Sequence, residues 1–171
     1  MNSAFRSSYD STNDDGSENR QLHGVDADGT FAFSGDACKG WYGHEVGQNF
    51  TVAGNLLTGE VVIDAVATAY ESDAPGDAPL AKRLIDALEA GHEVGGDKRE
   101  DLPVQSAAVK VVNTEEGKLS DPYFNDLRVD ATETPIADLE ETFETATRGW
   151  ADAMEKYEEA YETDDIDAAE E

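Results

Sequence analysis

The amino-acid sequence predicts an α+β fold. Strand-like and helix-like runs do not alternate strictly: a hairpin and a strand come first, two helices follow, and two strands precede one long helix. The length of 171 residues fits one domain with additional segments. We expect a disordered or loosely attached segment over residues 1–20, a main domain over 21–148, and a helix extension with an acidic tail over 149–171.

The clearest strand signal is a β-hairpin in residues 21–34. Two short runs, 21–26 and 30–34, flank Ala27-Asp28-Gly29, and Asp-Gly supplies the positive φ angles of a tight turn. Residues 50–56 predict a further strand, and residues 125–130 predict a shorter one. The β-rich run 106–113 predicts a strand in the middle of a sheet.

Apolar residues at helical spacing predict three helices. The first follows Gly59, the second ends at Gly91, and the third begins at Pro135 with Thr134 as its cap. The third helix either packs only on its own sheet or pairs, beyond Gly149, with a second chain. Its apolar residues follow a heptad spacing: Ile136, Leu139, Phe143, Ala146, Trp150, Ala153, Tyr157 and Ala160.

The charge of the chain is strongly negative. Lys and Arg total 12 and Asp and Glu total 39, which gives a net charge of −27. Such charge causes self-repulsion that concentrated salt screens, so the composition is typical of a protein from a halophile. The alternative is an acidic tail that mimics nucleic acid or binds a basic partner, but the carboxylates are spread over nearly every segment. Duplex nucleic acid is excluded as a partner, because it requires a cationic surface.

The sequence also indicates the compartment. No stretch approaches the roughly 18 consecutive apolar residues of a membrane-spanning helix, and no apolar signal segment is present near Met1. A single cysteine, Cys38, is typical of a reducing environment. These features predict a cytoplasmic protein that does not enter a membrane.

No metal or cofactor site is predicted. The run Asp26-Ala27-Asp28-Gly29 begins like a calcium loop, but the twelfth position, which needs a bidentate Glu, is Ala37. The three histidines do not have the spacing of zinc ligands.

Four polar residues are candidates for binding a small molecule, whose identity the sequence leaves unknown. Asn55 lies at the end of a predicted strand, between Gly54 and a turn, where its amide can point into a cleft or close the turn. Arg99 offers a fork of donors that fits a carboxylate, and Asp97 can orient it. Gln105, at the start of the next strand, supplies a further amide.

An ordered set of motifs between about residue 20 and about residue 148 resembles the domain of unknown function 1028 family, which is classed among Ntn-hydrolase-like proteins. The resemblance implies a partial αββα sandwich with a long C-terminal helix, and amide-bond hydrolysis by an N-terminal Thr, Ser or Cys. The motifs are Arg20-Gln21-Leu22-His23-Gly24-Val25-Asp26, Trp41-Tyr42-Gly43-His44, Gly54-Asn55-Leu56-Leu57, Pro79-Leu80-Ala81-Lys82-Arg83-Leu84, Gly95-Gly96-Asp97-Lys98-Arg99, Gln105-Ser106-Ala107-Ala108 and Asp126-Leu127-Arg128-Val129-Asp130.

This sequence differs from the family pattern at its start, and the difference decides whether we expect catalysis. Family members begin with a nucleophile-bearing strand and half of the sandwich, whereas this sequence starts with Met1 and Asn2. We therefore expect a chain that is catalytically incompetent alone. The alternatives are an amide-bond hydrolase completed by another chain or by an extended gene product, and a non-catalytic module that oligomerises or binds a small molecule. Oligomers are expected through residues 136–161 or through exposed sheet edges.

Overall fold

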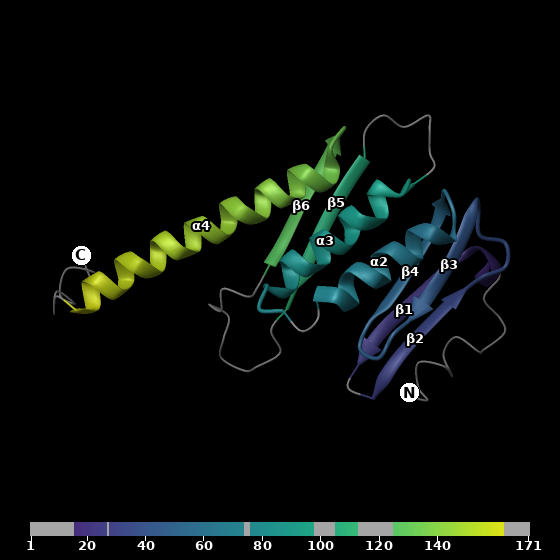
Figure 1. Ribbon diagram of the computed structural model, residues 1–171, viewed down its shortest axis with the longest axis horizontal. Helices are drawn as coiled ribbons and strands as arrows, with labels where there is room; N and C mark the ends of the chain where they lie inside the picture. Colours follow the sequence, from purple (N-terminus) through teal and green to yellow (C-terminus); the bar gives the residue numbers. More distant parts are fainter. Residues whose placement is uncertain (1–15, 27, 74–75, 98–104, 113–124, 163–171) are drawn as a thin grey trace. The chain divides into compact units, whose positions relative to one another are not determined.

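The computed structural model describes residues 16–26, 28–73, 76–97, 105–112 and 125–162 (Figure 1). These residues form three α-helices and three two-stranded antiparallel sheets, so the α+β prediction is confirmed. The chain divides into two compact units. Unit 1 comprises residues 1–78 and 86–103, and unit 2 comprises residues 79–85 and 104–171, so helix α3 contributes residues to both.

Two hairpins make up the strands of unit 1. β1 (Gln21–Asp26) pairs with β2 (Gly29–Ser34) across the predicted Asp-Gly turn, where the Asp26 carboxylate accepts bonds from the Asp28 and Gly29 amides. β3 (Trp41–Val46) pairs with β4 (Thr51–Leu57).

Helix α2 (Glu60–Asp73) covers the β3–β4 hairpin through its buried residues Val62, Ile63 and Ala67. Just before β4, Phe50 packs its ring against Tyr70 of α2, with ring centroids 5.1 Å apart. Within the same unit, Gly91 of α3 (Leu80–Glu93) lies so close to α2 that a Cβ there would be 2.5 Å from a methyl group of Val66. The close helix contact therefore depends on the small residue.

Unit 2 has its own apolar core on one face of a hairpin. β5 (Gln105–Val111) pairs with β6 (Asn125–Thr132), and alternate residues of both strands are exposed. The covered face packs against the first turns of α3 and against α4 (Pro135–Glu162). The buried core residues are Ala81, Ile85, Val109, Val111, Leu139 and Phe143.

Helix α4 begins at Pro135, as the sequence predicts. The Thr134 hydroxyl donates to the Asp138 carboxylate (2.9 Å), which also receives the Thr132 hydroxyl. The second half of α4 extends beyond the hairpin (Figure 1), and residues 147–153 are all exposed. Among the described residues, no helix combines the length and the apolar character needed to cross a membrane.

The structure corrects three local expectations. β3 was not predicted as a strand, because Gly43 interrupts its pattern of strand-forming residues. β5 was expected in the middle of a sheet, but within the described residues it pairs only with β6, and its outer face is exposed. Residues 16–20 are anchored rather than loose: Ser17–Asn19 form a 3-10 turn, and the Glu18 carbonyl accepts a bond from the Ala37 amide (2.7 Å). Residues 1–15 lie outside the described part.

Candidate functional site

The two hairpins of unit 1 meet through polar side chains. The register of the β1–β2 hairpin places Gln21, His23, Thr30 and Ser34 on one face. All four bond to the β3–β4 hairpin or to a residue at its turn. Facing sheets usually bury apolar side chains between them. A polar layer at this position therefore marks a candidate functional site.

Gln21 is the centre of this layer. Its Nε2 lies 3.0 Å from the carbonyl oxygen of Gly43 and 2.9 Å from that of Gly54. The same nitrogen lies 2.8 Å from the Ser34 hydroxyl, and Oε1 accepts a bond from Asn55 Nδ2 (2.8 Å). Ser34 in turn contacts His44 Nδ1 (2.9 Å). The amide of this β1 residue thus contacts side chains of β2 and β4 and backbone carbonyls of β3 and β4.

The partners determine where the protons lie. Backbone carbonyls only accept, so the Gln21 nitrogen faces them, and its oxygen must receive the Asn55 amide as a donor. The Ser34 oxygen presents a lone pair to the same nitrogen and lies 2.9 Å from His44 Nδ1. The tautomer of His44 determines which of these two atoms donates: when the ring proton is on Nε2, the Ser34 hydroxyl donates to Nδ1. Two N–H protons of Gln21 serve three acceptors, so at most two of these bonds form at once.

A β-bulge in the β3–β4 hairpin orients the side chain of Asn55. In β3 and β4, Trp41 pairs with Leu57 and Gly43 pairs with Gly54. Two residues of β4, Asn55 and Leu56, therefore lie opposite one residue of β3, Tyr42. Leu56 has a left-handed backbone (φ 57°), which costs a non-glycine residue about 1–2 kcal/mol. Its amide donates to the carbonyl of Lys39 (3.0 Å). Asn55 itself is exposed, so its amide group is both oriented and accessible.

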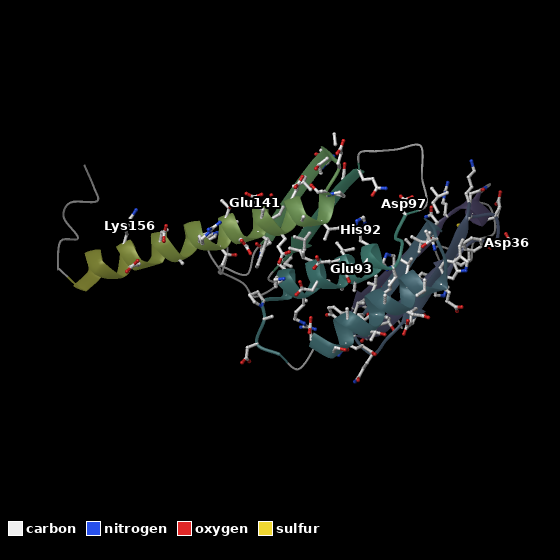
Figure 2. All side chains as sticks on the ribbon, turned by 45° about the horizontal axis from the view of Figure 1, so that its top comes forward. Asp36, His92, Glu93, Asp97, Glu141 and Lys156 are labelled. Carbon is white, nitrogen blue, oxygen red and sulfur yellow. The ribbon has the colours of Figure 1, made fainter. Side chains whose placement is uncertain are left out.

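The segment after α3 brings Asp97 to the same end of β4. Gly95 and Gly96 have positive φ angles (125° and 50°) and end the helix, because their amides donate to the carbonyls of His92 and Gly91. Asp97 then forms an antiparallel bridge with Leu57, two residues beyond Asn55. Figure 2 shows Asp97 on this segment, with His92 and Glu93 at the end of the helix.

Unit 2 contains a second bulge of the same kind. Asp130 and Ala131 lie opposite Ser106, and Ala131 has φ 53°. On the exposed face, Arg128 donates to Asp130 (2.7 Å), and this hydrogen bond lowers the pKa of the Asp130 carboxyl; a bond from Ser106 lowers it further. The same pairing raises the pKa of Arg128. Lys110 bonds Asp126 nearby (2.8 Å).

A sequence profile of a family of unknown function, DUF1028, matches residues 6–139. The chain belongs to this family. The resemblance carried by the motifs is therefore confirmed, and the matched residues include the polar layer and the bulge at Asn55. Among curated proteins, no significant match to this DUF1028 chain is found.

A solved structure extends the comparison. The crystal structure of protein SPO2555 from Silicibacter pomeroyi, which also carries the DUF1028 description, is similar to this DUF1028 chain, with a TM-score of 0.64 and 27% sequence identity. The similarity covers 78% of this chain and 53% of that chain. This DUF1028 chain thus spans about half the length of that relative.

The four residues predicted from the sequence have different positions. Asn55 and Asp97 both lie in unit 1, next to the same end of β4. Gln105 begins β5 in unit 2, and Arg99 lies outside the described residues. Sequence reasoning missed Gln21, Ser34 and His44. The alternation of β1 and β2 could have indicated the first two, because it places polar residues on one face of the hairpin.

The described part of unit 1 offers neutral hydrogen-bonding groups for chemistry. No group of three or more His, Cys, Asp or Glu side chains that could hold a metal ion occurs among the described residues. Asn55 presents an amide, and Ser34 and His44 present a hydroxyl beside an imidazole. Amides suit carbonyl, carboxylate or amide groups of a ligand, because they both donate and accept hydrogen bonds.

Proposed function

We propose that this DUF1028 chain is the ligand-binding part of an Ntn-hydrolase-like protein, a partial αββα sandwich that binds a small molecule carrying an amide or carboxylate group. The observation that supports it most is the Asn55 amide, which is exposed and bonded to Gln21 Oε1 at 2.8 Å. An oriented donor loses little conformational entropy when a ligand binds.

The backbone at Asn55 supports a binding role. Bulges commonly redirect a side chain next to an active site, and left-handed non-glycine residues cluster at ligand clamps. Gly40 also has a positive φ (68°), and a Cβ there would be 2.9 Å from the Cα of Leu56. The local chain is therefore built around this bulge, at a cost in backbone strain.

Asp97 and Arg99 complete the proposal. The backbone of Asp97 forms a β-bridge with Leu57, so Asp97 lies next to the end of β4 that carries Asn55. We assign Arg99 the role of pairing with a ligand carboxylate, because guanidinium forms two parallel bonds with this group. A ligand with amide, carboxylate and ammonium groups, such as an amino acid with a side-chain amide, suits these residue types.

Side-chain NMR tests the binding role. L-Asparagine and L-glutamine serve as probes, titrated in molar KCl while the amide N–H2 signals of Asn55 and Gln21 are followed. We expect both signals to shift and the thermal midpoint to rise. Asn55→Ala and Arg99→Ala should abolish the thermal shift, whereas Asn19→Ala, at an exposed amide that bonds only its neighbour Glu18 among the described residues, should preserve it. Equal responses in all variants would refute the site.

Amide hydrolysis by this chain alone is not part of the proposal. Ntn chemistry uses the terminal amine of a Thr, Ser or Cys as its base, whereas the proposed site consists of the Asn55 and Gln21 amides with Asp97 and Arg99. We expect no ammonia release when the purified chain is incubated with L-glutamine or L-asparagine. Ammonia release that persists after repeated purification and disappears in Asn55→Ala would instead favour the amide-bond hydrolase.

We further propose that a second copy of the chain pairs along the end of α4. Trp150 is 42% exposed, and the heptad spacing of the sequence continues past it. Such spacing favours helix pairing. Light scattering in molar KCl should give a dimer for the parent chain and a monomer for Trp150→Asp. A monomer in both would refute the pairing.

Salt adaptation and a cytoplasmic location form the last part of the proposal. The net charge of −27 supports salt adaptation, since screening of the repulsion requires concentrated salt. The free energy of unfolding in urea should be larger in molar KCl than in dilute buffer, and equal values would contradict salt adaptation.

A further inference from the structure

Ser34 and His44 form a pair whose chemistry differs from ligand binding at Asn55. Ser34 Oγ lies 2.9 Å from His44 Nδ1, and Gln21 Nε2 lies 2.8 Å from the same oxygen. When the ring proton of His44 is on Nε2, the Ser34 hydroxyl donates to Nδ1, and the Gln21 amide can occupy a lone pair of the same oxygen. A hydroxyl directed at a neighbouring base is the arrangement that activates a serine nucleophile.

We propose that Ser34 accepts an acyl group from activated esters, with His44 as its general base. Ser34 Oγ attacks the ester carbonyl carbon, a bond between Oγ and that carbon forms, and the hydroxyl proton passes to His44 Nδ1. The bond between the carbonyl carbon and the leaving oxygen then breaks and releases a phenolate. Water hydrolyses the acyl-serine to a carboxylic acid and restores the Ser34 hydroxyl.

Aryl esters are the matching substrate class. Their phenolate leaves without a proton, so the reaction needs only a base at the nucleophile. His44 is exposed and Ser34 is partly exposed, so the pair is accessible to a small ester. The amide substrates of Ntn hydrolases have a poorer leaving group than aryl esters. The ester reaction therefore tests this inference separately from the function proposed above.

The molecule contains an internal control. His23 Nδ1 lies 2.9 Å from the Thr51 hydroxyl, the same type of pair at the same distance, also between the two hairpins. Gln21 Nε2 contacts the Ser34 hydroxyl oxygen, but among the described residues no side-chain amide contacts the Thr51 hydroxyl oxygen. If the Gln21 amide directs the proton, only Ser34 should be acylated.

The experiment uses p-nitrophenyl acetate with the full chain in molar KCl. We expect release of p-nitrophenolate and an acetyl group on Ser34, located by peptide mass spectrometry. Ser34→Ala should abolish this acetylation, and His44→Gln should slow it about 100-fold, in the range of general-base catalysis. Gln21→Met should also slow it, and His23→Gln should slow it far less than His44→Gln does. Circular dichroism verifies that each variant is folded.

Three outcomes would overturn the proposal. The first is acetylation confined to lysines or to Met1. The second is an undiminished rate in Ser34→Ala together with loss in His44→Gln, which would make the imidazole itself the nucleophile. The third is equal slowing by His23→Gln and His44→Gln, which would show that a hydroxyl beside a histidine reacts regardless of the Gln21 amide.

Discussion

Replacing Gln21 by methionine removes the side-chain hydrogen bonds of Gln21, most of which reach the second hairpin of unit 1, and keeps the length of the side chain. Nε2 can donate two bonds at a time among three acceptors, and Oε1 accepts one from Asn55. Three bonds at about 0.5–1.5 kcal/mol each would contribute roughly 1.5–4.5 kcal/mol. Since Gln21 is only partly buried, water replaces part of this, and we expect Gln21→Met to destabilise unit 1 by about 2 kcal/mol.

Gln21→Glu provides a sharper version of the same test. A carboxylate at this position would face the carbonyl oxygens of Gly43 and Gly54, so the folded state would raise the pKa of the new carboxyl. A raised folded-state pKa means that stability relative to the parent is present at low pH and is lost as the pH rises through that pKa. Gln21→Met should lack this pH dependence, because it has no ionisable group.

The assay follows unit 1 alone. Trp41 lies in β3 of unit 1 and Trp150 in α4 of unit 2, so a Trp150→Phe background leaves Trp41 fluorescence as the probe of urea unfolding in molar KCl. Asn19→Ala is the matched amide control, with an expected change within about 0.5 kcal/mol. A loss of less than about 0.5 kcal/mol in Gln21→Met would show that the network contributes no net stability and would refute the reasoning.

Three further predictions concern unit 2. Leu139 is fully buried (0% exposed), so Leu139→Ala should cost about 2–5 kcal/mol in urea unfolding followed by helical circular dichroism, and a loss below about 1 kcal/mol would contradict the assigned core. Ala131 is exposed at φ 53°, so Ala131→Gly should leave stability unchanged or raise it by up to about 1 kcal/mol; a clear loss would argue against the left-handed bulge. Arg128→Gln should return the lowered pKa of Asp130 toward its ordinary value in a carbon-13 NMR titration. In the parent chain, this pair stabilises the fold above the ordinary carboxyl pKa, and its effect disappears as the pH falls through the lowered value.

Local signals explain which elements could be predicted from the sequence. The first hairpin and the start of α4 follow from an Asp-Gly turn and from Thr134-Pro135, whose chemistry acts within a few residues. β3 could not be predicted in this way, because Gly43 weakens its local pattern and the strand is stabilised by pairing with β4 and packing against α2. Local pattern is thus sufficient only where a turn or cap determines the structure.

The candidate site was less accessible to sequence reasoning. Asn55 was found because glycine and a strand end precede it, and Asp97 because it follows two glycines. The residues that flank Asn55 and Asp97 indicated a turn in the sequence. The hydrogen-bond partner of Asn55 is Gln21, however, which belongs to a different hairpin. Side-chain bonds between separate hairpins leave no periodicity in the sequence, so the contacts of Gln21 with Asn55 and of Ser34 with His44 emerged only from the three-dimensional arrangement.

The polar layer of unit 1 has a thermodynamic consequence. Exposure of apolar groups on unfolding increases heat capacity, whereas exposure of polar groups decreases it. The hairpins of unit 1 are joined by amides, hydroxyls and imidazoles, and unit 2 is closed by aliphatic and aromatic side chains. The polar layer should therefore lower the heat-capacity change on unfolding of unit 1, compared with an apolar layer of the same area, and flatten its stability curve.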